Sequence, residues 1–125
     1  NAVGIVAASY TKEVGSTKWK DDPGVKGFQE LRAKYLPNVD QDNTIAFQGY
    51  SQAVTMARIL EQCGDELTHA NVLKHATNLA GYQAPIFLPG ISYSTSPDDY
   101  SPIKTLFMGT FNGKDWDLDA APVSQ

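Results

Sequence analysis

The segment from Asn43 to Gly64 restricts the fold of this chain more than any other, and it lies within the longest proline-free stretch. Apolar residues recur there at three- and four-residue spacing, which predicts one buried face of a long helix. These positions are Tyr50, Ala53, Val54, Ala57 and Leu60, and the face is widened by Ala46, Gly49, Met56 and Cys63. Little of the helix is then left for water, so we expect other elements to pack on several of its sides. Gly64 is a natural end, because glycine enters the left-handed cap conformation without steric cost.

Two neighbouring residues fit poorly with a purely structural helix. Gly49 lies in its first turns, where glycine costs roughly 1 kcal/mol relative to alanine. Tyr50 places a hydroxyl among apolar neighbours. A core tyrosine with a satisfied hydroxyl and a tyrosine that contacts a ligand explain this placement equally well. The pair is therefore the first candidate for a functional site.

The composition excludes several classes of function. With 125 residues, the chain is one domain or part of one. Its net charge of −4 and its pI near 4.9 argue against a nucleic-acid partner, which requires a concentrated basic surface. Cys63 is the single cysteine, which excludes an internal disulfide and a cysteine-based metal site. No segment has the length and apolar character of a membrane span.

The chain begins on Asn1 and Ala2 without an initiator methionine, and we interpret residues 1–2 as the remnant of a tag. We expect residues 3–125 to be a single domain cut from a longer protein. The run from Val3 to Tyr10 is rich in β-branched and small residues, which predicts a strand buried on both faces, as in a parallel sheet. The polar residues that follow predict a loop, which Trp19 tethers to the body.

Two more helices flank the central one. Asp22-Pro23 begins the first, because the Asp side chain accepts orphan N–H groups and proline loses nothing at the first helical position. Leu36-Pro37 ends it, since the residue before proline is pushed out of the α region. Thr68 is a good N-cap for the other helix, and Leu67 is positioned to form a hydrophobic staple with Val72. Its predicted inward residues are Val72, Leu73, Ala76 and Leu79.

The last third of the chain has a different character. Four prolines exclude helix there and leave at most a short strand from Ile91 to Tyr93; they are Pro85, Pro89, Pro97 and Pro102. Asn112-Gly113 separates the runs Thr105–Phe111 and Lys114–Leu118, which predicts a two-residue β-hairpin with both turn residues at positive φ. The expected fold is α/β, in the order strand, helix, helix, helix and C-terminal hairpin.

No catalytic set or metal site assembles from the sequence, so we predict no enzymatic activity and no cofactor. His69 and His75 lie six residues apart on one helix, which places them on nearly opposite faces. The aspartates near the hairpin lack a glycine-containing ligand loop, and we interpret them as a solvated face. Cys63 ends an apolar helix and is more simply a small core residue than a nucleophile.

A binding site is the remaining possibility. Tyr10 ends the first strand, and ligands of open α/β sheets collect beyond the carboxyl ends of strands. Gln48, Gly49 and Tyr50 lie at the beginning of the central helix, where backbone dipoles and a phenol can face a polar small molecule. For Tyr10, a structural role is somewhat favoured.

Several collinear motifs resemble one protein family. They are Gly4-Ile-Val-Ala-Ala-Ser-Tyr-Thr-Lys-Glu, Trp19-Lys-Asp-Asp-Pro-Gly-Val-Lys-Gly-Phe, Gly49-Tyr50 before Gln62-Cys-Gly-Asp-Glu-Leu-Thr, Leu88-Pro-Gly-Ile, Thr95-Ser-Pro-Asp-Asp-Tyr-Ser-Pro-Ile-Lys and Phe111-Asn-Gly-Lys-Asp-Trp. Together they resemble the C-terminal third of periplasmic substrate-binding proteins of branched-chain amino-acid ABC transporters, the type I or Leu/Ile/Val-binding class. The resemblance extends from Val3 to about Pro122.

The resemblance implies a partial Rossmann-like lobe of a two-lobed periplasmic protein that closes around a ligand. It implies an ABC importer component that binds an amino acid or related small carboxylate, with permease subunits as partners. Tyr50 occupies the position of a ligand-contacting tyrosine in that family, and Tyr10 is a weaker correspondence. A ligand-sensing domain of a receptor or regulator is the alternative. The family's principal carboxylate-binding residues lie upstream of this chain, so we expect the chain alone to bind ligand weakly and to associate with itself through uncovered apolar surface.

Overall fold

The computed structural model describes residues 2–119 and 121–124. Asn1, half of the predicted tag remnant, lies outside them. The elements are β1 (Val6–Ser9), the 3₁₀ turn η1 (Thr17–Trp19), α1 (Pro23–Tyr35), α2 (Thr44–Cys63), α3 (His69–Ala76), β2 (Ala80–Tyr82), β3 (Tyr93–Ser94), β4 (Thr105–Phe111), β5 (Trp116–Leu118) and β6 (Val123–Ser124). This α/β order confirms the predicted strand, three helices and C-terminal hairpin. None of the described helices is both long enough and apolar enough to cross a membrane.

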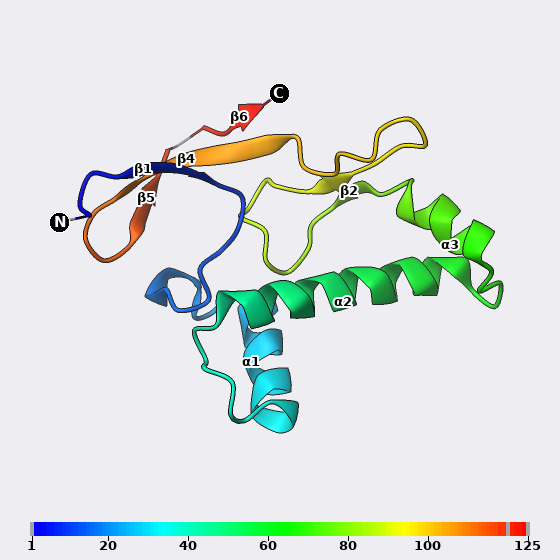
Figure 1. The fold of residues 1–125 in the computed structure, drawn as a ribbon, viewed down its shortest axis with the longest axis horizontal. Coiled ribbons are helices and arrows are strands. Elements are labelled where there is room, and N and C mark those ends of the chain that lie inside the picture. The colour runs from blue at the N-terminus through cyan, green and yellow to red at the C-terminus, as the bar shows by residue number, and fades with distance from the viewer. Residues whose placement is uncertain (1, 120, 125) are drawn as a thin grey trace.

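The strand β1 pairs with the far end of the chain. It runs antiparallel to β4, with Val6 opposite Thr110 and Ser9 opposite Phe107, and β4 also pairs with β5 and β6. Figure 1 shows this sheet above α2, with α1 on the other side of that helix. The prediction of a strand buried on both faces is wrong, because Val6 is 60% exposed. Small apolar residues mark a fully buried parallel strand only where helices cover both faces of the sheet.

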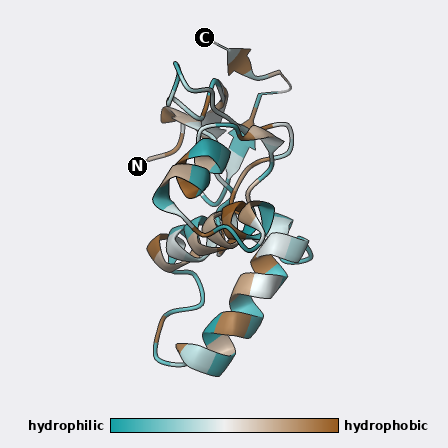
Figure 2. Cartoon of the chain, turned by 90° about the vertical axis from the view of Figure 1, so that its right-hand side faces the viewer, coloured by the Kyte–Doolittle hydropathy of each residue, from teal (hydrophilic) through white to brown (hydrophobic). Residues whose placement is uncertain are grey.

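The helix α1 begins and ends at the predicted residues. The Asp22 carboxylate accepts the backbone N–H groups of Gly24 and Val25, and Leu36 is the C-cap. The first turns of α1 are buried through Val25 and Phe28, whereas Tyr35 near its end is 64% exposed. Hydrophobic and hydrophilic residues alternate along α1, the lowest helix in Figure 2, as it leads away from the rest of the molecule. Only the first turns of α1 therefore pack against the core.

The ends of α2 confirm the sequence prediction, but its buried face does not. Asn43 is the N-cap, and its side chain accepts the backbone N–H of Ala46. Gly64 is the C-cap. Much of the predicted face is wrong, because Ala53, Met56, Ala57 and Leu60 are exposed. Of the predicted residues Cys63 is buried, and Ala46, Tyr50 and Val54 are half-buried. The buried residues instead follow one another at four-residue spacing, namely Phe47, Ser51, Thr55, Ile59 and Cys63. Hydroxyls can occupy this face because both are hydrogen-bonded: Thr55 to the carbonyl of Ser51, and Ser51 to the N–H of Ile86.

The helix α3 is shorter than predicted. Thr68 is its N-cap, as expected, but the helix ends at Ala76, where Thr77 forms the C-cap. Leu79 is buried beyond the helix, directly before β2, which the sequence did not predict. Leu67 is exposed instead of packing as a staple. The extended segment takes over from the helix because Leu79 donates its N–H to Thr95 Oγ1, on the chain beyond β3.

The hairpin between β4 and β5 is present, but its turn is longer than predicted. Phe111 lies opposite Trp116, so residues 112–115 form the loop. Gly113 has φ of 104°, whereas none of the described non-glycine residues has a positive φ. The Asn112 side chain accepts the N–H groups of Lys114 at 3.0 Å and Asp115 at 2.9 Å. These hydrogen bonds satisfy two backbone N–H groups of the loop, and Asn112 does not enter the left-handed region.

The centre of the core is the irregular, proline-containing segment after β2. Its buried residues are Ala84, Ile86, Phe87, Leu88 and Ile91, and they pack with Phe28 of α1 and Phe47 of α2. The segment continues the pairing of the sheet, because Lys12 donates its N–H to Ile86 O and Leu88 donates to Tyr10 O. Figure 1 shows this segment between the sheet and α2.

Candidate functional site

A small hollow lies where the chain leaves β1 and passes the first half of α2. It has a volume of about 40 Å³. Its lining combines apolar and polar groups: Tyr10, Thr11, Gln48, Ser51, Gln52, Ile86, Phe87, Tyr93 and Ile103. The end of β1, the first half of α2 and the core segment thus meet at one place. This is the position relative to the strand that the sequence predicted for a ligand.

The structure brings two of the four predicted site residues together. Tyr10 and Gln48 both line the hollow, although one follows β1 and the other belongs to α2. Gly49 is exposed, and no heavy atom apart from its chain neighbours and the nearby backbone of α2 lies within 4 Å of the place where a Cβ would stand. Tyr50 faces α1: its ring lies 5.8 Å from that of Phe28. A ligand contact through Gly49 or Tyr50 stays a prediction.

Tyr50 is held in a cluster of aromatic rings. It stacks on Phe47 with 6.4 Å between the ring centroids, and its hydroxyl lies over Gly27, where a Cβ would come within 2.6 Å of the Tyr50 oxygen. Burial, followed by the charge of Glu30 and the neighbouring Tyr82, raises the pKa of the Tyr50 hydroxyl. The group therefore keeps its proton at neutral pH.

Two aromatic residues of the hollow were missed by sequence reasoning. Tyr93 and Phe87 pack edge to face with 4.6 Å between centroids, and Phe87 also contacts Tyr10 at 6.0 Å. Burial, followed by the neighbouring Tyr10 and Tyr82, raises the pKa of the Tyr93 hydroxyl. Both missed residues come from the proline-containing part of the chain, where no periodicity indicates which side chains point inward.

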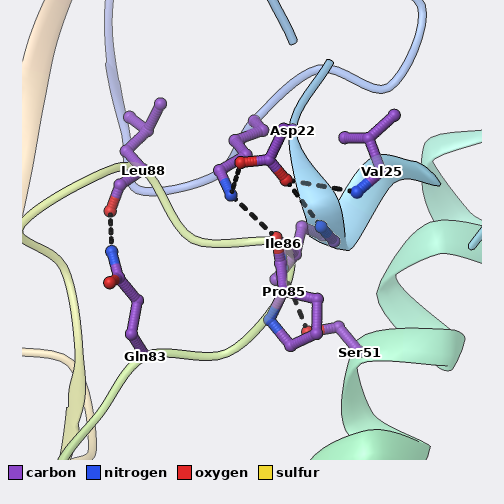
Figure 3. A network of polar contacts seen from close by, with 9 residues as sticks. Asp22, Val25, Ser51, Gln83, Pro85, Ile86 and Leu88 are labelled. Atoms are coloured by element: carbon purple, nitrogen blue, oxygen red, sulfur yellow. Dashed lines mark hydrogen bonds and ion pairs between the residues drawn. The ribbon is translucent and has the colours of Figure 1, made fainter. Parts of the chain in front are cut away.

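A buried ion pair fixes the backbone beside the hollow. Lys12 is 6% exposed, and its Nζ donates to Asp22 Oδ2 at 2.7 Å and to Pro85 O at 3.1 Å. The other Asp22 oxygen caps α1, as Figure 3 shows. Ser51 of α2 accepts the Ile86 N–H at 3.3 Å in the same view. The core segment is thereby tied to the beginning of α1 and to α2, which holds the lining residues in place.

The groups that line the hollow are of kinds that bind small molecules. Within residues 2–119 and 121–124, no three His, Cys, Asp or Glu side chains lie close enough to hold a metal ion. His69 is exposed, and Cys63 is a buried free thiol at the end of α2. The hollow offers amide and hydroxyl groups beside aromatic rings, which suits a polar small molecule with an apolar part.

Comparison with known proteins gives one informative match. No protein-family model matches the chain, and no curated protein matches it. A solved structure of a branched chain amino acid ABC transporter from Thermus thermophilus with bound valine matches it with a TM-score of 0.73 and 14% sequence identity. The match covers 99% of this chain and 34% of that one. The chain has the fold of a partial lobe of a periplasmic-binding-like protein. At this identity the likeness concerns the fold, and it confirms the predicted fold class.

Proposed function

We propose that the chain is part of a periplasmic solute-binding component of an ABC importer. The observation that carries this proposal is the fold likeness along 99% of the chain to an amino acid ABC transporter structure with bound valine. The likeness to a transporter favours an importer component over the alternative of a sensor domain. The proposed ligand is an amino acid or a related small carboxylate, bound without chemical conversion.

The hollow at Tyr10 and Gln48 is proposed as one wall of the ligand cleft. Its volume of about 40 Å³ is too small to enclose an amino acid, so the ligand would lie across it against a second lobe. The Gln48 amide and the Tyr10 hydroxyl supply hydrogen bonds, and Phe87 and Tyr93 supply apolar surface. Closure of two lobes around the ligand favours the closed state by population shift, and permease subunits would recognise that state.

A thermal-shift panel of amino acids and small carboxylates, on the longer protein that contains this chain, tests the proposal. We expect at least one compound to raise the melting temperature with saturation. Gln48→Ala should then weaken binding about three- to tenfold through a lost hydrogen bond, whereas Gln62→Ala, at an exposed position near the other end of the same helix, should leave binding unchanged. Tyr50→Phe separates the fourth candidate: equal binding places the Tyr50 hydroxyl outside the site. A panel without any saturable shift contradicts the proposal.

A further inference from the structure

Both tryptophans of the chain line a single cavity. Trp19 comes from η1 and Trp116 from β5, and the cavity between them has a volume of about 210 Å³. Its floor is formed by small and aliphatic residues of the sheet and core segment: Ala7, Ala8, Gly109, Leu118 and Leu88. It shares only Thr11 with the hollow at Tyr10 and Gln48. The cavity is therefore a second place where a small molecule can bind.

Two carboxylates from distant parts of the chain stand beside the tryptophans. Glu13 and Asp115 both line this cavity. They also line an adjoining surface pocket, whose other charged residues are Asp42 and Lys114. Burial, followed by the charge of Asp115, raises the pKa of Glu13, and a hydrogen bond to Trp116 acts in the opposite direction. Among the ion pairs of the described residues, none involves Glu13 or Asp115. An added cation would relieve their repulsion.

The ring of Trp19 already attracts ammonium groups. Lys18 Nζ lies 5.3 Å from its centroid, and Lys12 Nζ lies 5.8 Å from it. The Lys12 ammonium is held by Asp22, whereas Lys18 lines the cavity and forms no ion pair within the described part of the chain. A ring face with a nearby ammonium is the arrangement of a cation–π interaction. Lys18 thus occupies part of the place that a free cation would take.

We propose that this cavity binds a small organic cation: a primary ammonium with an apolar body. The ammonium lies beside Glu13 and Asp115, and the body packs between Trp19 and Trp116 on the aliphatic floor. The site is separate from the proposed amino-acid cleft. The ligand proposed for this cavity has an ammonium group and no carboxylate, unlike the ligand proposed for the cleft. The two sites can therefore be tested independently.

Tryptophan fluorescence provides a direct test, because both fluorophores line the cavity. The chain is titrated with benzylammonium chloride and, at matched ionic strength, with neutral benzyl alcohol. We expect a saturable change in fluorescence, with a half-saturating concentration about fivefold lower for benzylammonium than for benzyl alcohol. A factor of this size corresponds to a partly exposed charge interaction. Equal concentrations for the two compounds overturn the proposal, as does a linear, non-saturable response to benzylammonium.

Charge variants determine whether the binding depends on these residues. Glu13→Gln and Asp115→Asn should each weaken benzylammonium binding about two- to fivefold. Asp119→Asn, at an exposed position directly after β5, should have little effect on binding. Lys18→Met should strengthen binding by a similar factor, because it removes the competing ammonium. Lys20→Met changes the net charge equally but does not line the cavity. If Lys18→Met weakens binding or matches Lys20→Met, the proposal is wrong even where a carboxylate variant fails to fold.

Discussion

The buried ammonium of Lys12 ties three separate parts of the chain together at the scale of a single residue. It contacts the Asp22 carboxylate that caps α1 and the Pro85 carbonyl of the core segment. Lys12→Met leaves that carbonyl without its donor and the carboxylate without its charge partner. We expect a loss of about 2–3 kcal/mol in the free energy of unfolding, below the full cost of an uncompensated buried charge, because the Asp22 side chain retains some contact with water.

Urea denaturation measures this loss, and the neighbouring pair Lys26–Asp21 supplies the control. Its atoms lie 3.0 Å apart, but both side chains are largely exposed to solvent. Lys26→Met should therefore change the stability little. Equal losses for Lys12→Met and Lys26→Met would show that burial adds nothing to the Lys12 contact.

At the scale of the helices, two glycines allow opposite predictions. Gly49 lies at an exposed position of α2 with open space around the Cβ position, so Gly49→Ala should stabilise the chain by about 1 kcal/mol. Gly27 lies in α1, where a Cβ would come within 2.6 Å of the Tyr50 hydroxyl. Because the Tyr50 ring is held by Phe28 and Phe47, we expect Gly27→Ala to destabilise by about 1 kcal/mol despite its better helix propensity.

Thermal or urea unfolding distinguishes the two glycine substitutions by sign. Adding Tyr50→Phe to Gly27→Ala removes the clashing oxygen and should restore most of the loss. A Gly27→Ala variant as stable as Gly49→Ala would mean that the Tyr50 ring moves freely, which contradicts the tight aromatic cluster.

Both ends of α1 and α2 and the beginning of α3 were predictable from sequence, whereas the end of α3 and the buried face of α2 were not. A cap depends on a few neighbouring residues, such as Asp22 with the next two N–H groups, or Asn43 with that of Ala46. The buried face depends on what packs against it. Ser51 became a core residue because Ile86, far along the chain, needs an acceptor there. Periodicity selected Ala53 and Leu60 instead, since it has no information about that partner.

At the scale of the whole molecule, sequence reasoning selected some of the residues that line the hollow and missed others. The rule that ligands collect beyond strand ends, together with the start of α2, selected Tyr10 and Gln48, and these share a hollow. Tyr50 was selected for its hydroxyl among apolar neighbours and for the family resemblance, but it lies two positions beyond Gln48 on α2, and its ring packs against Phe28 of α1. Phe87 and Tyr93 reach the hollow through a segment without periodicity. The antiparallel pairing of β1 with β4 likewise depends on two ends of the chain that no local pattern connects.

Glu13, in the loop after β1, and Asp115, in the loop between β4 and β5, line the same cavity, which makes their repulsion a property of the whole fold. Because the pKa of Glu13 is raised above 4.5 in the folded chain, the folded state binds more protons than the unfolded state across this range. The contribution of Glu13 to stability is therefore fully present below the unfolded value and declines as pH rises through the folded value.

Glu13→Gln removes this decline. Relative to the unmodified chain, the stability of the variant in urea denaturation should rise as the pH increases through the ordinary carboxyl pKa and the raised folded pKa of Glu13, and it should stay higher above them. Asp115→Asn should lower the pKa of Glu13 toward its ordinary value, which carboxyl NMR titration measures directly. A Glu13 pKa that does not respond to Asp115→Asn would show that the two ends of the chain do not interact through these charges, and burial alone would then account for the shift.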